Sequence, residues 1–106
     1  MKISSLADMT GGWFIGDFAP ACWKTGEFEV GCKEYRKGDS ESAHVHRVAT
    51  EITLILRGRA RMNGRDLSAG AIVLLEPGEA ATFAALEDTT TVVVKIPSAP
   101  GDKYAV

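Results

Sequence analysis

The sequence predicts an all-β protein built as an antiparallel sandwich or barrel. Turn-forming residues recur at short intervals, as at Asn63-Gly64 and Pro77-Gly78, and the runs between them are rich in β-branched and aromatic residues. Helix signals are weak, since only residues 3–9 could form one short turn. A length of 106 residues with a hydrophobic fraction of 45% suits a single domain, residues 1–106, with one core.

Eight segments between these turns have the pattern of a strand. In chain order they are residues 13–16, 27–36, 43–47, 51–57, 59–62, 71–75, 80–84 and 89–96. Asn63-Gly64 separates the fifth of these segments from a short run at 65–67, and this dipeptide is a strong signal of a two-residue hairpin turn.

Two of these segments are apolar on both faces. They lie at residues 51–56 and 91–96, where Lys95 is the main exception. A small barrel has one interior, so the second apolar face must be covered by the N-terminal segment or by another subunit. We therefore expect a homodimer.

The charge of the chain gives no indication of a nucleic-acid partner. The net charge is -2, and the only basic cluster is spaced as one solvated face of a strand: Arg57, Arg59, Arg61 and Arg65.

No apolar stretch is long enough to cross a bilayer, and the N-terminus lacks the apolar region of a signal peptide. These features predict a cytoplasmic protein. Cys22 and Cys32 do not form a CxxC motif, so we interpret them as free thiols that pack as small hydrophobic residues.

The two histidines of the chain stand two residues apart, at His44 and His46. Residues two apart on a strand point to the same face. Glu51 follows after a short connection, at the start of the next strand, where its carboxylate can reach the same space. Two imidazoles and one carboxylate on one face suit Fe(II), Mn(II), Zn(II) or Ni(II), and they leave positions open for water or substrate.

The spacing Gly38-x5-His44-x-His46-x4-Glu51-x6-Gly58 resembles the first motif of the cupin superfamily at every defined position. The resemblance implies a double-stranded β-helix, or jelly-roll, barrel with an antiparallel core at about residues 27–97. Residues 1–26 would form an N-terminal extension that packs on the barrel or on a partner. The ending from Pro97 onward resembles the tail that follows the last cupin strand, and its prolines prevent continuation of the sheet.

The second cupin motif is matched only in part. Gly70 and Gly78 fit it, whereas Glu76 and Ala85 stand where the family usually has proline and asparagine. Ala81 stands where the family usually has a third histidine ligand. Three alternatives remain open: a two-histidine, one-carboxylate site, a substitute ligand for which Glu79 is the nearest candidate, or a site that no longer binds metal.

Residues that lie two or four positions from a candidate ligand on the same strand share its face and should line the space around the metal. On this basis Thr53 and Ile55 accompany Glu51, and Phe83 accompanies Ala81. One of Glu34 and Tyr35 should also face the interior. Lys95 has two interpretations: a partner for a substrate carboxylate or phosphate inside the barrel, or an edge residue whose ammonium group reaches solvent, and we favour the second.

The resemblance leaves the activity open. It implies one divalent metal ion, and the mononuclear cupins include dioxygenases, isomerases, epimerases, decarboxylases and lyases that act on small polar molecules such as sugars or organic acids. The alternatives are a non-catalytic module that binds or senses such a ligand, and a storage or structural protein. No catalytic residue is identified from the sequence.

Overall fold

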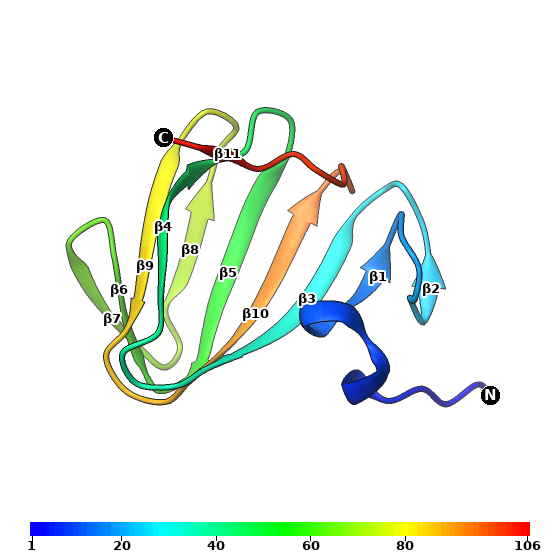
Figure 1. Ribbon diagram of the computed structural model, residues 1–106, viewed down its shortest axis with the longest axis horizontal. Coiled ribbons are helices and arrows are strands. Elements are labelled where there is room, and N and C mark those ends of the chain that lie inside the picture. The colour runs from blue at the N-terminus through cyan, green and yellow to red at the C-terminus, as the bar shows by residue number, and fades with distance from the viewer.

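The computed structural model describes residues 1–106, which form two facing β-sheets (Figure 1). One sheet has six strands in the order β2-β1-β3-β10-β5-β8, and the other has five in the order β11-β4-β9-β6-β7. Only the short β1–β2 pair is parallel. The strands, in chain order, are β1 (Trp13–Gly16), β2 (Trp23–Lys24), β3 (Glu29–Tyr35), β4 (Ser40–Val45), β5 (Thr50–Arg57), β6 (Arg59–Met62), β7 (Arg65–Ser68), β8 (Ile72–Leu75), β9 (Ala80–Ala85), β10 (Thr89–Ile96) and β11 (Tyr104–Ala105).

The prediction of an antiparallel all-β protein is confirmed. All eight expected strands are present, with ends that differ by at most three residues. The hairpin at Asn63-Gly64 also forms, and both residues have positive φ angles, 49° and 76°, as a tight two-residue turn requires. The expected helical turn near residues 3–9 is replaced by two short turns of 3-10 helix, η1 (Leu6–Asp8) and η2 (Thr10–Gly12).

The tail after β10 departs from expectation. The first sheet does end at Ile96, before Pro97, but the chain then crosses to the other sheet and pairs as β11 with β4. The prolines at 97 and 100 lie in the crossing segment, so they do not prevent the later strand. In Figure 1 this segment runs across the top of the barrel from the end of β10 to β4.

The core lies between the inner faces of the two sheets. Inward side chains alternate with outward ones along β5, β9 and β10, as the sequence pattern predicts. The buried apolar cluster consists of Ile55, Ala60, Met62, Leu75, Ala81, Phe83 and Ala85. Three of its members, Met62, Ala81 and Phe83, also line a cavity together with inward-facing polar side chains.

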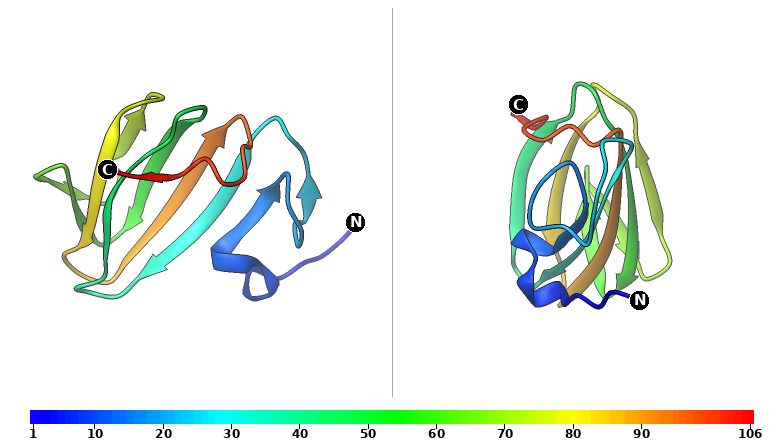
Figure 2. Two further views of the ribbon diagram at one scale, coloured as in Figure 1. Left: turned by 45° about the horizontal axis from the view of Figure 1, so that its top comes forward. Right: turned by 90° about the vertical axis from the view of Figure 1, so that its right-hand side faces the viewer.

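The N-terminal segment extends the six-stranded sheet and covers the open end of the barrel. β1 pairs with β3, and the indole of Trp13 lies directly over Gly31, where a Cβ atom would come within 2.7 Å of the ring. The end-on view in Figure 2 shows this segment across the opening between the sheets. It does not cover the outer face of β5 and β8, where Ile72 and Leu74 are 69% and 55% exposed.

Candidate metal site

A β-bulge in β4 directs two side chains that are three residues apart toward the same interior. Glu41 pairs with Phe83 and His44 pairs with Ala81, so three steps along β4 match two steps along β9. In a regular strand, residues three apart point to opposite faces. Because of the extra residue, both Glu41 and His44 line one cavity.

His46 lies one residue beyond the end of β4, in the connection to β5, and is 4% exposed. Its backbone carbonyl accepts a hydrogen bond of 2.8 Å from the N–H group of Gly78. Glu51 is the second residue of β5 and is 8% exposed on the inner face. The two strands and their connection therefore bring both side chains into the interior, as the spacing predicted.

The three predicted ligands converge. One ligand atom from each of His44, His46 and Glu51 lies within 4.8 Å of the others. The distance from His46 Nε2 to Glu51 Oε1 is 3.5 Å, and the two imidazole centroids are 5.2 Å apart. Ligand atoms bonded to one ion at about 2.1 Å lie about 3 to 3.5 Å from one another. The His46–Glu51 pair thus has the spacing that a single ion requires, and His44 lies within 4.8 Å of both.

The Nε2 atom of His46 lacks a partner of its own. It is buried and makes no hydrogen bond, because 3.5 Å to Glu51 is a charge contact rather than a well-formed hydrogen bond. Buried polar atoms in proteins nearly always have a partner. A cation between the imidazole and the carboxylate would satisfy both, so the residues present fit a metal ion.

The charges around the site shift two pKa values. The contact with Glu51 raises the pKa of His46 above its ordinary value, although burial opposes this shift. Burial would raise the pKa of Glu51, but His46, Lys95 and His44 together lower it. Glu51 is therefore ionised at neutral pH, which is the form that binds a metal.

The cavity beside the three ligands is small and carries several hydroxyl groups. Its volume is about 40 Å³, room for only a few water-sized groups. The Tyr35 hydroxyl donates a hydrogen bond of 2.9 Å to Glu41, and its ring lies 4.4 Å from that of Phe83, centroid to centroid. The buried Oγ1 of Thr91 has no hydrogen-bond partner. Glu41 and Thr91 were not identified from the sequence, because no motif or spacing distinguishes them. Tyr35 was one of two candidates, and the other, Glu34, is exposed.

The structure places four of the predicted lining residues on inner faces. Thr53, Ala81 and Phe83 line this cavity, and Ala81 lies directly opposite His44 in the β4–β9 ladder. Ile55 is also on the inner face but is fully buried in the apolar core, one step too far along β5 to reach the cavity.

The interpretation of Lys95 as an edge residue is wrong. β10 lies between β3 and β5, and Lys95 is paired with Glu29 on one side and Glu51 on the other. Its ammonium group lies 3.7 Å from Glu29 and 4.8 Å from the centroid of the Trp13 ring. Lys95 lines a separate cavity of about 250 Å³, rather than the cavity beside His44 and Glu51.

Glu79 is not brought into the site. It lies in the turn before β9, is exposed, and accepts a hydrogen bond of 3.1 Å from the backbone N–H of Glu76. The expectation assumed that Glu79 shares a strand face with Ala81, but the strand begins only at Ala80.

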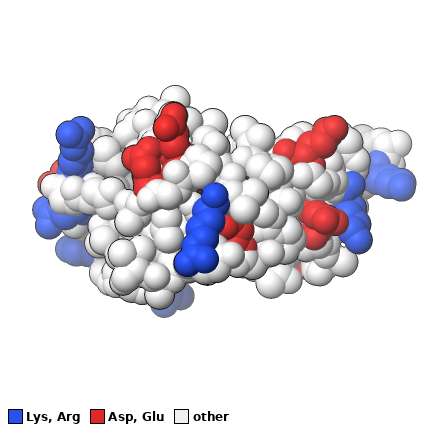
Figure 3. All heavy atoms as spheres, turned by 90° about the horizontal axis from the view of Figure 1, so that it is seen from above, with Lys and Arg blue, Asp and Glu red and all other residues white.

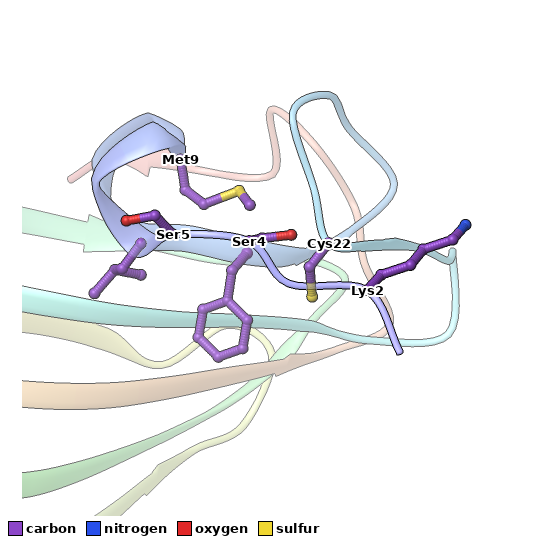
Figure 4. Close-up of a pocket in the computed structure, with 7 residues that line it drawn as sticks. Lys2, Ser4, Ser5, Met9 and Cys22 are labelled. Carbon is purple, nitrogen blue, oxygen red and sulfur yellow. The ribbon is translucent and has the colours of Figure 1, made fainter.

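The largest of the described cavities lies elsewhere, at the N-terminal segment, with a volume of about 350 Å³. Figure 4 shows Met9 and Cys22 beside it, while the amine of Lys2 extends away. It contains no cluster of buried polar groups, so size alone does not identify it as a functional site.

Comparison with solved structures identifies the fold. A protein of Klebsiella pneumoniae with a double-stranded β-helix domain is 25% identical, with a TM-score of 0.69 over 76% of this chain and 72% of that one. A cupin protein from Bacteroides fragilis is 20% identical, with a TM-score of 0.60 over 72% and 70% of the two chains. The chain has the double-stranded β-helix fold of the cupins.

The fold also resembles part of a larger enzyme. Oxalate decarboxylase from Bacillus subtilis is 17% identical, with a TM-score of 0.67 over 76% of this chain but only 24% of that chain. No model of a known family and no curated protein sequence matches the chain.

The surface of the protein carries charges of both signs. On the face seen in Figure 3, acidic and basic side chains are interspersed among uncharged ones, and neither sign forms a continuous patch. No helix is long and apolar enough to span a membrane.

Proposed function

We propose that this protein binds one divalent metal ion through His44, His46 and Glu51 and acts as a metal-dependent enzyme on a small polar molecule. The observation that carries the proposal is the convergence of these three ligand atoms within 4.8 Å, together with the unpartnered, buried Nε2 of His46. Two imidazoles and a carboxylate form a neutral-plus-anionic donor set that suits Fe, Mn, Zn or Ni.

The surroundings of the ligands support a small substrate. A bound ion would supply Lewis acidity or redox chemistry at this point of the barrel. The cavity of about 40 Å³ admits only a small group, and Thr91 and Thr53 offer hydroxyls to it. Tyr35 donates to Glu41 and so keeps that carboxylate turned toward the cavity wall. These features favour an organic acid or the reactive end of a sugar.

A non-catalytic binding module is the alternative. It is supported by Ala81, because the position opposite His44 contributes no ligand, and by the lack of an unpaired general base in the cavity. The separate cavity lined by Lys95 and Trp13 could then contribute to recognition.

Metal binding is tested by calorimetric titration of metal-free protein with Mn(II), Fe(II), Ni(II) and Zn(II). We expect uptake at micromolar concentration by the wild type, loss of binding in His46→Ala, and strongly weakened binding in Glu51→Gln. The fold should persist in these variants, because apolar side chains of the strands, and not the ion, form the buried core.

The matched control is Glu79→Gln, which makes the same change to an exposed carboxylate outside the site. It should bind metal like the wild type. If the wild type takes up none of these ions, the metal proposal fails. If it binds metal and small organic acids or sugars without converting any of them, the binding-module alternative replaces the enzyme.

We further propose that the protein is a cytoplasmic homodimer. The unpaired Cys22 and Cys32 are consistent with a reducing compartment. The dimer is supported by the outer face of the six-stranded sheet, whose exposed apolar residues lie on three neighbouring strands.

A further inference from the structure

The C-terminal segment lies directly against the candidate metal site. After β10 it crosses the end of the barrel, and β11 pairs with β4 so that Ala105 is opposite His44 and Tyr104 is opposite Val45 (Figures 1 and 2). The guanidinium group of Arg47 lies 3.9 Å from the centroid of the Tyr104 ring. This segment is therefore fixed to the same strand and connection that carry the two histidines.

Within this segment, the side chain of Asp102 fastens the connection between β4 and β5. Its carboxylate accepts hydrogen bonds from three consecutive backbone N–H groups: Arg47 at 2.8 Å, Val48 at 3.1 Å and Ala49 at 2.9 Å. Asp102 is 8% exposed. Burial would raise its pKa, but the amide donors of Ala49, Arg47 and Val48 outweigh burial and lower it. The ionised carboxylate therefore holds the three residues that follow His46 in place through hydrogen bonds to their backbone.

The backbone carbonyl of the same residue contacts the imidazole of His46. Nδ1 of His46 is within hydrogen-bond distance of the Asp102 carbonyl oxygen. A carbonyl oxygen can only accept, so Nδ1 must carry the proton and donate it. In the neutral ring, Nε2 then has the free lone pair, and Nε2 is the atom that faces Glu51.

We propose that Asp102 is a positioning residue that sets the tautomer of His46 and holds its Nε2 lone pair toward the metal position. The carboxylate accepts hydrogen bonds from the connection between β4 and β5. These hydrogen bonds place the carbonyl of the same residue against Nδ1 of His46. A ligating histidine usually donates its other N–H to such an acceptor, which fixes the ring and strengthens the ligand. The metal part of this inference rests on the proposed function, whereas the tautomer does not.

The tautomer is tested in the metal-free protein by 15N NMR of the imidazoles at about pH 9, where a histidine is mostly neutral. In the wild type, His46 should show protonated Nδ1 and unprotonated Nε2. Asp102→Ala should shift His46 toward a mixture of both tautomers, and Asp102→Asn, which retains an amide oxygen for the same N–H groups, should restore the wild-type pattern in part. Lys103→Ala, an exposed neighbour in the same segment, is the control and should change neither signal.

Metal affinity provides the second measurement. Loss of such a supporting contact should weaken binding by about 10- to 100-fold in Asp102→Ala. A wild-type His46 that is mainly protonated at Nε2 would overturn the proposal, and this result does not depend on whether any variant folds. An Asp102→Ala variant that folds and keeps both the tautomer and the affinity would also overturn it. Failure of the wild type to bind metal, with the Nδ1-protonated tautomer intact, would refute the proposed function alone.

Discussion

Tyr35 shows how one buried side chain can shape the interior of the barrel. Its hydroxyl donates a hydrogen bond to Glu41 and its ring packs on Phe83, so Tyr35 contacts both a polar and an apolar side chain of the interior. Burial, and next the negative charge of Glu41, raise the pKa of Tyr35 well above its usual range. The phenol therefore remains protonated through the neutral and mildly alkaline range.

This shift predicts a pH dependence of stability. The pKa of Tyr35 is higher in the folded state than its unfolded value of about 10, so its contribution is complete below about pH 10 and is lost as the pH rises above it. Tyr35→Phe should cost about 1 kcal/mol at neutral pH, because one buried hydrogen bond is removed. The difference between the two proteins, measured by urea unfolding, should shrink at alkaline pH. Absorbance titrations showing that Tyr35 ionises at its ordinary pKa would contradict this prediction.

At the scale of strands and turns, the two glycines of the first motif have different physical roles. Gly58 has a φ of 89°, and a Cβ atom there would lie 2.2 Å from the backbone oxygen of Asp88. Gly38 has a φ of 93°, but no atom lies within 4 Å of its Cβ position. Gly58 is thus required by close packing as well as by its backbone angle, whereas Gly38 is required by its angle alone.

This contrast predicts unequal costs of the same substitution. Gly38→Ala should lower the free energy of unfolding by about 1 to 2 kcal/mol, the cost of a positive φ for alanine. Gly58→Ala should cost at least about 2 kcal/mol more, because backbone atoms must also move. Chemical denaturation of the two variants under the same conditions measures the difference. Equal losses in the free energy of unfolding would show that the close approach of Asp88 adds no cost at Gly58.

The sequence predicted the elements and the convergence of His44, His46 and Glu51, because both depend on local patterns. Turn residues and strand alternation located β4 and β5, and a separation of two residues placed both histidines on one side. The errors concern information that is not local. Whether Lys95 lies at an edge depends on which strands flank β10, and Glu79 missed the site because the strand starts one residue later.

The contacts that support the site were beyond sequence reasoning for the same reason. Asp102 reaches the connection after His46 from 55 residues away along the chain. The bulge in β4 has no signal in the alternation of its residues, so the inward position of Glu41 could not be derived together with that of His44.

At the scale of the whole molecule, the outer face of the six-stranded sheet presents two apolar rows. Leu54 lies between Val92 and Ile72 in one row, and the next row contains Val94, Ile52 and Leu74. β8 is the edge strand of this sheet, so the most exposed members of both rows lie at its border. Burial of such surface contributes about 25 cal/mol per Å².

A second copy of the chain covering these rows would remove them from water. We expect the wild type to sediment as a dimer at micromolar concentration and the double variant Ile72→Lys/Leu74→Lys to sediment as a monomer. Ser68→Lys, which adds the same charge at an exposed position of the other sheet, should leave the dimer intact. A wild type that remains monomeric would refute the proposed assembly.

The bulge in β4 also has a consequence for changes in chain length. In a regular strand, removal of one residue reverses the facing of every side chain beyond it. In β5, such a deletion before Thr53 would turn either Glu51 or the residues of the core outward. In β4, removal of Ser42 or Ala43 would instead leave Glu41 and His44 two positions apart, paired with the same partners and facing the same way. β4 can therefore lose a residue without changing the face to which His44 points. β5 cannot lose a residue before Thr53 without turning Glu51 or the core residues outward.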